Sequence, residues 1–147
     1  MAITKSLSIE DTNLAERSIV SAREQVYSDI DLSFAKKSNG DIFKKTEAAA
    51  VKQAVKTLIQ TNFGERPFNY YFGSNIRALL FEPMNPITEQ RMKDEVTEAV
   101  KRHEPRAQVI GVTVDGQEDQ NRYVVKILFN LSSEAEPQEL ETYFERV

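Results

Sequence analysis

The chain carries few of the side chains on which enzymes base nucleophilic or metal chemistry. It has one histidine, His103, and no cysteine, so a histidine triad, a cysteine nucleophile and a histidine-rich metal site have little support. His103 falls in the last turn of a predicted helix, where a capping or surface position is a sufficient explanation. We therefore expect no catalytic residue, no metal site and no cofactor.

Acidic residues are abundant, but abundance is not evidence of hydrolysis. A chain with 23 Asp and Glu residues contains carboxylate pairs at glycosidase spacing by chance. The sequence has no P-loop, dinucleotide fingerprint or HExxH motif, and the segment 115–119 (DGQED) has its glycine at the wrong position for an EF-hand loop. We interpret that segment as a hairpin turn.

The segment Glu104-Pro105-Arg106 is the first of three candidates for protein recognition. Its rigid proline holds two opposite charges close together where a helix meets a strand, and it leaves Arg106 able to bind a carboxylate through two parallel hydrogen bonds. From spacing alone, a helix end with ordinary surface charges remains the favoured interpretation, because exposed ion pairs are common and contribute little.

The second candidate is an aromatic loop. Residues 66–73 (RPFNYYFG) contain Arg66, Phe68 and Phe72 with two tyrosines between them. A rigid turn that presents aromatic rings and a guanidinium is typical of protein interfaces. The same rings would equally suit a loop that folds back over its own core. Both interpretations remain open.

The third candidate is the C-terminal segment, in which Leu140, Thr142 and Phe144 alternate with polar or charged residues. A helix would fit these residues nearly as well, but we favour a third strand at an exposed sheet edge. A bare edge is a template for pairing with another chain. The charged residues between 139 and 146 would either block such pairing or set the register of a partner strand.

Composition bounds the class of protein. With 147 residues and 40% hydrophobic content, the chain is expected to form one domain around one core. A net charge of −4 with no basic face argues against nucleic-acid binding. The sequence has neither a secretory signal nor an apolar run of membrane-spanning length, so we expect a soluble protein. The lack of cysteine is compatible with a reducing cytoplasm.

Three helices are predicted in the first part of this domain. An amphipathic helix over 46–61 has Thr46 as its N-cap, and Gly64 ends it. Ser74 caps a short second helix that stops before two prolines. Thr88 caps a third helix, in which Ile87 packs on Met92, and Pro105 ends that helix. The buried stripe of the third helix comprises Met92, Val96, Ala99 and Val100.

Strand periodicity follows. Gln108, Ile110, Val112 and Val114 share one side of a predicted strand, and a polar turn over 115–121 joins it to a second strand with alternating residues from 123 to 131. The fold class is α+β, with about three helices packed on one face of a small antiparallel sheet and an extended N-terminal arm. We assign residues 1–45 to the arm and 46–147 to the domain, with helices in 46–103 and the sheet in 106–147.

Six short motifs, in this order, resemble those of the GPW/lysozyme-like baseplate wedge family. They are residues 28–34 (SDIDLSF), 40–42 (GDI), 64–68 (GERPF), 72–74 (FGS), 79–83 (LLFEP) and 104–106 (EPR). The resemblance covers residues 27–147. The family includes the small wedge subunit of contractile-tail phages and is similar to a baseplate subunit of the type VI secretion system.

The resemblance implies a structural protein of the virion tail baseplate, made in the cytoplasm of the host bacterium. It implies that the Glu-Pro-Arg turn docks on a helical core bundle of larger wedge subunits. It also implies that the sheet accepts strands from the tail sheath protein and initiates sheath polymerisation; tube or hub proteins are further candidate partners. The expected protein-binding residues are Arg66, Phe68, Phe72, Glu104, Pro105, Arg106, Leu140, Thr142 and Phe144.

Two alternatives stay open. One is a tail-associated peptidoglycan hydrolase, suggested by the family label, to which no residue is assigned. The other is a component of a type VI secretion baseplate. Residues 1–26 lie outside the resemblance, and we expect them to form an arm that orders on binding a neighbour.

Overall fold

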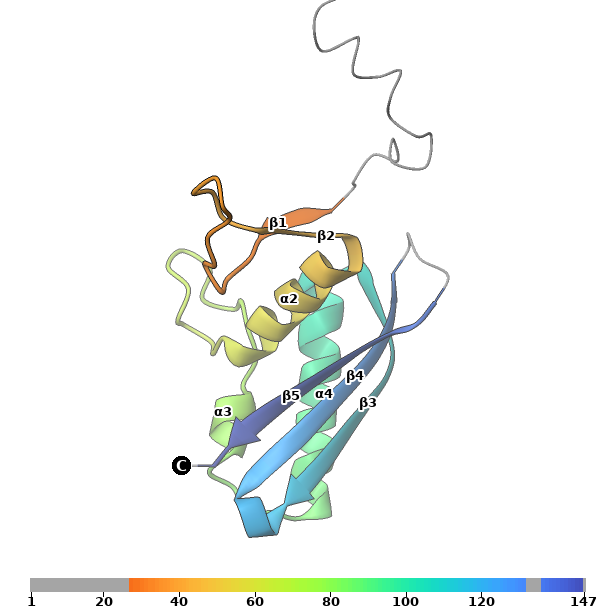
Figure 1. Cartoon of the computed structure of the whole chain (residues 1–147). Helices are drawn as coiled ribbons and strands as arrows, with labels where there is room; N and C mark the ends of the chain where they lie inside the picture. The colour runs from red at the N-terminus through yellow and green to blue at the C-terminus, as the bar shows by residue number, and fades with distance from the viewer. Residues whose placement is uncertain (1–26, 132–135, 147) are drawn as a thin grey trace, which may run out of the picture.

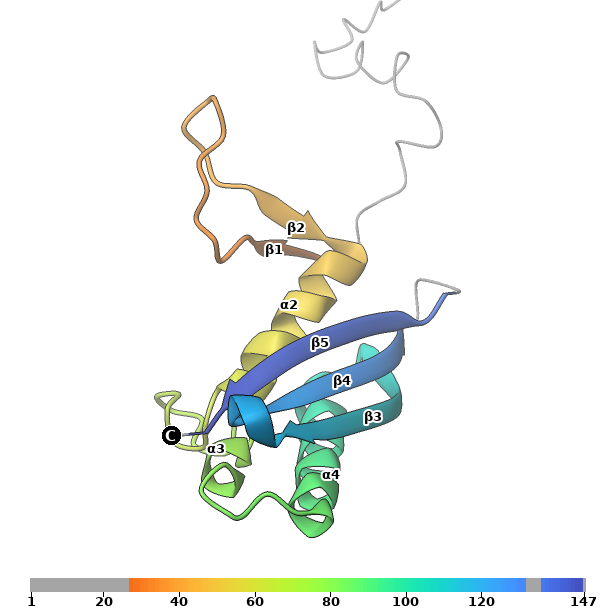
Figure 2. The same cartoon turned by 60° about the horizontal axis from the view of Figure 1, so that its bottom comes forward.

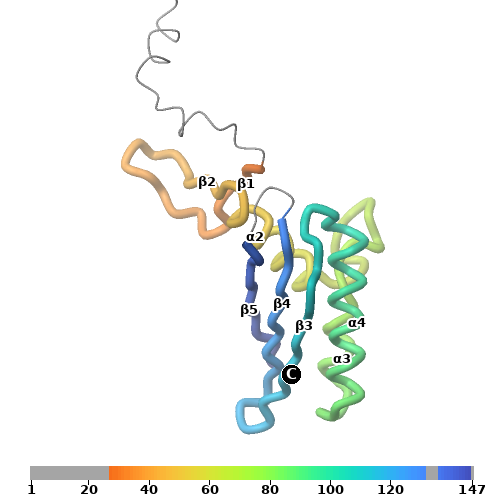
Figure 3. The backbone as a smooth tube through the Cα atoms, turned by 90° about the vertical axis from the view of Figure 1, so that its right-hand side faces the viewer, coloured from red at the N-terminus to blue at the C-terminus, as the bar shows by residue number. Residues whose placement is uncertain are grey.

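The computed structural model describes residues 27–131 and 136–146. In this part of the chain, the helices α2 (Glu47–Gln60), α3 (Ile76–Leu79) and α4 (Pro86–His103) lie on one face of a sheet (Figures 1 and 3). The sheet is antiparallel in the order β3 (Ala107–Gln117), β4 (Arg122–Leu131) and β5 (Gln138–Glu145), with a short 3-10 turn at Glu118–Gln120. The predicted α+β class is confirmed. None of the described helices is long and apolar enough to cross a membrane.

The core lies between the helices and the sheet. The predicted stripe of α4 is buried as expected, and Val51, Val55, Leu58 and Ile59 of α2 are buried with it. The odd-numbered residues of β4 from Tyr123 to Leu131 supply the sheet side of the core. Burial of these apolar stripes against the sheet is the main force that holds the layers together.

The helix ends differ from those predicted. α4 begins at Pro86, and its N-cap is Asn85, whose Oδ1 accepts a hydrogen bond from the Thr88 amide at 2.8 Å. The prediction of Thr88 was three residues late, because proline is well suited to the first helical position, where its amide hydrogen is not needed. Ile87 is 67% exposed, so its predicted packing on Met92 is wrong.

The predicted span and N-cap of α2 are confirmed, whereas its predicted end at Gly64 and the predicted cap of α3 are wrong. Thr46 is the N-cap of α2, but its side chain makes no capping hydrogen bond. α2 ends at Gln60, before Gly64, which adopts a left-handed conformation in the following loop. Asn75, and not Ser74, caps α3; the Ser74 hydroxyl donates to the carbonyl oxygen of Ile59 at 2.8 Å and so ties the loop to α2.

A β-bulge changes the predicted facing of β3. The pairing register of β3 with β4 shifts between Val109 and Gly111, which reverses the alternation of inward and outward side chains. Val112 and Val114 are buried, but Gln108 and Ile110, predicted on the same side of the strand, are exposed. Strict period-two reasoning cannot place such an extra residue.

A small hairpin, β1 (Ser28–Ile30) and β2 (Lys44–Thr46), lies at the N-terminal end of α2, away from the main sheet (Figure 2). Gln53 of α2 holds it there. A polar residue on an amphipathic helix is expected to face solvent, yet Gln53 is 8% exposed. Its Nε2 donates to the Ile30 carbonyl oxygen at 2.7 Å and to Asp29 Oδ2 at 3.3 Å, and its Oε1 accepts from the Leu32 amide at 3.4 Å.

Replacing Gln53 by alanine should release the hairpin from α2. The substitution leaves backbone groups of Ile30 and Leu32 without their partner, at a cost of about 1–3 kcal/mol. We expect faster hydrogen exchange at the Asp31 amide, which bonds to the Phe43 carbonyl oxygen, and unchanged exchange in β4. Gln60→Ala, at an exposed position of the same helix, is the matched control. Equal protection in both variants would contradict this account.

Candidate protein-binding site

The turn between α4 and β3 is held by backbone hydrogen bonds. The Glu104 amide donates to the Val100 carbonyl oxygen at 2.8 Å, and the Ala107 amide donates to the Glu104 carbonyl oxygen at 3.1 Å. Pro105 has no amide hydrogen to continue the helix, so the chain reverses into β3. The predicted helix end at this proline is confirmed.

The two charges of this turn bind each other. Arg106 Nε lies 2.5 Å from Glu104 Oε1, and Arg106 Nη2 lies 2.5 Å from Glu104 Oε2. The Glu104 side chain is 9% exposed and that of Arg106 is 40% exposed. The hydrogen bonds that Arg106 donates to Glu104 are the main reason that the pKa of Arg106 is raised above its usual value, and the guanidinium therefore remains charged.

This geometry corrects the expectation for Arg106. The edge of the guanidinium formed by Nε and Nη2 binds the chain's own Glu104. A partner carboxylate would have to approach the other edge, formed by Nη1 and Nη2. Glu104 itself is buried, so its role in any docking is to orient Arg106.

The hairpin also reaches Arg106. The Cζ of Arg106 lies 5.2 Å from the centre of the Tyr27 ring, a cation–π distance. Asp29, two residues further on, adds to the favourable electrostatic environment of the guanidinium. Sequence reasoning missed both residues as neighbours of this turn, because no local pattern brings together segments so far apart in the chain.

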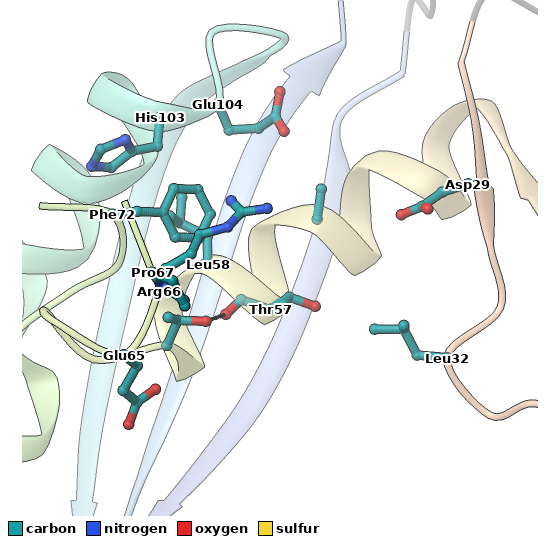
Figure 4. A pocket seen from close by; sticks show the side chains of 12 residues that line it. Asp29, Leu32, Thr57, Leu58, Glu65, Arg66, Pro67, Phe72, His103 and Glu104 are labelled. Carbon is teal, nitrogen blue, oxygen red and sulfur yellow. Dashed lines mark hydrogen bonds between the residues drawn. The ribbon is translucent and has the colours of Figure 1, made fainter. Parts of the chain in front are cut away.

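A cavity of about 600 Å³ opens beside the turn (Figure 4). Its lining comes from the hairpin, α2, the aromatic loop and the end of α4, and includes Asp29, Leu58, Arg66, Phe72, His103 and Glu104. The Arg66 Cζ lies 4.3 Å from the centre of the Phe72 ring, whose other neighbour is the His103 ring at 5.2 Å. The structure thus brings together three of the predicted residues, Arg66, Phe72 and Glu104.

One ring of the aromatic loop packs on the core and the others are exposed, so each of the two open interpretations holds for part of the loop. Phe72 packs against the core, whereas Tyr70 and Tyr71 are 65% and 70% exposed. Phe68 is fully exposed and has a φ of 64°, an unusual conformation for a large residue. Gly73 holds the loop against α2, because a Cβ at this position would lie 2.4 Å from the Thr61 carbonyl oxygen.

The C-terminal segment is the predicted edge strand, β5. Its side chains Leu140 and Thr142 are buried and Phe144 packs on the core, so these three predicted binding residues face the helices. Two cavities border this side of β5, one of about 540 Å³ at Leu140 and one of about 320 Å³ at Phe144.

The hydrogen-bond pattern shows which backbone groups of β5 are available. The Gly116 amide of β3 binds Glu89 Oε1 at 3.1 Å, so it points away from β4 and its partner Tyr123 points its backbone groups toward β5. Phe144 pairs with Tyr123, and the alternation then directs the amide and carbonyl groups of Tyr143 away from β4. By the same period of two, residues 139, 141 and 145 present theirs at the free edge.

Comparisons with known proteins identify baseplate proteins as relatives of this chain. A family model described as "Baseplate wedge protein gp25" matches residues 45–136. Baseplate wedge protein gp25 of Enterobacteria phage T4 is 31% identical over 107 residues, which are 73% of this chain and 81% of that protein.

Solved structures share the fold. A putative tail lysozyme from Geobacter sulfurreducens is 26% identical with a TM-score of 0.60, over 65% of this chain and 86% of that one. A chain of the anti-feeding prophage baseplate is 16% identical with a TM-score of 0.58, over 82% and 86%. A chain of the type VI secretion baseplate complex is 14% identical with a TM-score of 0.55, over 64% and 88%. The last two similarities concern the fold alone.

Arg106→Ala should destabilise the isolated protein. It leaves the buried Glu104 carboxylate without its partner, which costs about 1–3 kcal/mol. The double variant Glu104→Leu/Arg106→Met removes both charges and should recover most of that stability. Arg102→Ala, which breaks the exposed pair with Glu98, is the control and should cost under about 0.5 kcal/mol. Urea denaturation of the four proteins measures this; equal midpoints for Arg106→Ala and the control would refute it.

Proposed function

This chain belongs to the baseplate wedge protein gp25 family, and on that premise we propose that it docks on a helical core bundle of larger wedge subunits and initiates sheath polymerisation. The family membership identifies it as a structural component of the virion tail baseplate that assembles with other baseplate proteins. The two docking roles are the proposal. The first uses the Glu104–Arg106 turn, and the second uses the free edge of β5.

Three features support docking at the turn. Glu104 holds the guanidinium of Arg106 in one orientation, so little side-chain entropy remains to be lost on binding. The exposed edge of that guanidinium remains available for a partner's carboxylate or carbonyl oxygen. The adjoining cavity, lined partly by Leu58 and Phe72, provides room for apolar side chains from a helical bundle.

The unequal edges of the sheet are the observation that carries the sheath-initiating role. The edge of β3 is interrupted by the bulge at Val109–Gly111, and Glu89 of α4 occupies the Gly116 amide. β5 pairs regularly with β4 from residue 138 to 145 and presents its other edge. A strand from a sheath subunit that adds to β5 would form backbone hydrogen bonds in a fixed register.

The proposed role is non-catalytic. The similarity to a putative tail lysozyme keeps a peptidoglycan hydrolase as the second candidate. That candidate requires cell-wall clearing by the purified protein that is lost when one carboxylate is changed to its amide. A zymogram of the wild-type protein distinguishes the two functions, and we expect no clearing.

The wedge-docking role predicts that Glu104→Leu/Arg106→Met folds but does not assemble. Loss of a guanidinium that is desolvated against a partner should cost about 2–5 kcal/mol of binding. Co-expression with the larger wedge subunits and size-exclusion chromatography would show the variant eluting apart from them. Arg102→Ala, on the same helix end, should assemble normally. Normal assembly of the double variant would rule out this docking site.

The sheath role predicts that Glu141→Pro permits baseplate assembly but stops sheath growth. Proline lacks the amide hydrogen that residue 141 presents at the free edge, so an added strand loses a hydrogen bond while the β4–β5 ladder keeps all of its own. Glu141→Ala removes the same side chain, including its contact with Lys126, and leaves the amide in place. Electron microscopy should show sheathed tails with Glu141→Ala and bare tubes or baseplates with Glu141→Pro. Sheathed tails with both would reject strand addition at this edge.

A further inference from the structure

We propose that the strand received by β5 alternates basic and apolar residues, with its basic side chains beside the acidic face of β5 and its apolar side chains over α2 and α3. This inference rests on the proposed function, because it requires strand addition at the free edge. It adds the chemical character of the partner segment and a reason for its register.

The outward face of β5 is acidic. Glu139, Glu141 and Glu145 are exposed on the side of the sheet away from the helices, and Tyr143 completes the row. Every second residue of a strand recurs at about 7 Å, so these carboxylates form a ladder along the edge. A strand that adds beside β5 would place its own outward side chains about 5 Å away from this ladder.

Neighbouring cations neutralise this ladder only in part. Glu141 has Lys126 at 3.9 Å. Glu139 lies across from Leu128, which carries no charge. Arg122 lies across from Glu145, but its Nε donates to Gln117 Oε1 at 2.8 Å and its Cζ is 4.8 Å from the Tyr143 ring. The acidic row therefore favours cations on the incoming strand, since opposite charges directly across a pair of strands stabilise it.

The inward face of β5, toward the helices, borders cavities with apolar side chains in their linings. The two cavities beside Leu140 and Phe144 share Gln60 in their linings, so they adjoin along α2. The cavity at Phe144 is lined in part by Ile59 and Leu80, and the cavity at Leu140 in part by Leu32 and Ala49. Every second side chain of an added strand would point to this inward face. If these side chains are apolar, they would enter the two cavities and be buried there.

Cations line the inward side. Lys52 and Lys56, one turn apart on α2, line the cavity at Leu140 beside the Lys45–Asp31 ion pair, and Arg77 of α3, paired with Glu65, lines the cavity at Phe144. A slip of one residue would turn every basic side chain of the added strand toward these cations. Attraction by the glutamates on the outward face of β5 and repulsion by the cations of the helices on the inward face thus favour the same register of the added strand.

The same charges disfavour a second copy of this chain as the occupant. Two β5 strands paired edge to edge would place one acidic row beside another, and like charges directly opposite destabilise a strand pair. A basic–apolar segment of a different protein is therefore the occupant that the charges favour.

Synthetic peptides of the length of β5 test this inference on the full-length chain. One peptide alternates lysine with valine, the second replaces each lysine by glutamate, and fluorescence anisotropy gives the dissociation constants. We expect the basic peptide to bind about tenfold more tightly, with a preference that falls as salt rises. In Glu139→Lys/Glu145→Lys the preference should disappear or reverse. Equal binding of both peptides to the wild-type protein, or no binding of the basic peptide at millimolar concentration, overturns the inference.

Sheath growth separates this inference from the function on which it rests. Baseplates with Glu139→Lys/Glu145→Lys should assemble but fail to start a sheath, as with Glu141→Pro. If Glu141→Pro blocks the sheath and the lysine variant does not, strand addition stands and the charge inference fails. If neither variant blocks the sheath, the proposed function fails.

Discussion

The reversal of the chain at Glu104–Arg106 is the constraint on which the rest of the structure depends. It joins the end of α4 at His103 to the start of β3 at Ala107 through a tight turn, so the longest helix must lie directly against the sheet. The backbone hydrogen bonds of Glu104 and the ion pair between its buried carboxylate and Arg106 fix both sides of this reversal. Once α4 is placed, α2 covers the remaining part of the same face, and none of the described helices lies on the opposite face (Figure 3).

That open arrangement makes the two sheet edges unequal. α4 lies against β3, and its Glu89 accepts a hydrogen bond from the Gly116 amide of that strand, so the helix that stabilises β3 also occupies part of its outer edge. β5 is the last strand, far from α4, and it has α2 beneath it and no strand beyond it in the described chain. An interrupted edge at β3 and a regular edge at β5 follow from a helix layer with α4 at one end, and an interrupted edge is a poorer template for an added strand.

Strong periodicity predicted most of this fold, and its failures have specific causes. The stripes of α2 and α4 and the alternation of β4 were correct because burial imposes those periods over many residues. The helix starts were missed where asparagine is the N-cap, at Asn75 and Asn85, and one extra residue at Ile110 reversed the facing of half a strand. The neighbours Tyr27 and Gln53 could not be predicted, because their contacts join segments that are distant in sequence.

The same limit applies to the candidate site. Spacing alone identified Glu104 and Arg106 as a pair but left their partner open, and the structure shows that each is first the partner of the other. A buried ion pair is weak evidence for stability, since apolar residues of similar volume often stabilise a fold as well. An apolar pair would hold this turn but would present no charge. The pair is therefore better explained by the orientation it imposes on an exposed guanidinium than by any contribution to folding.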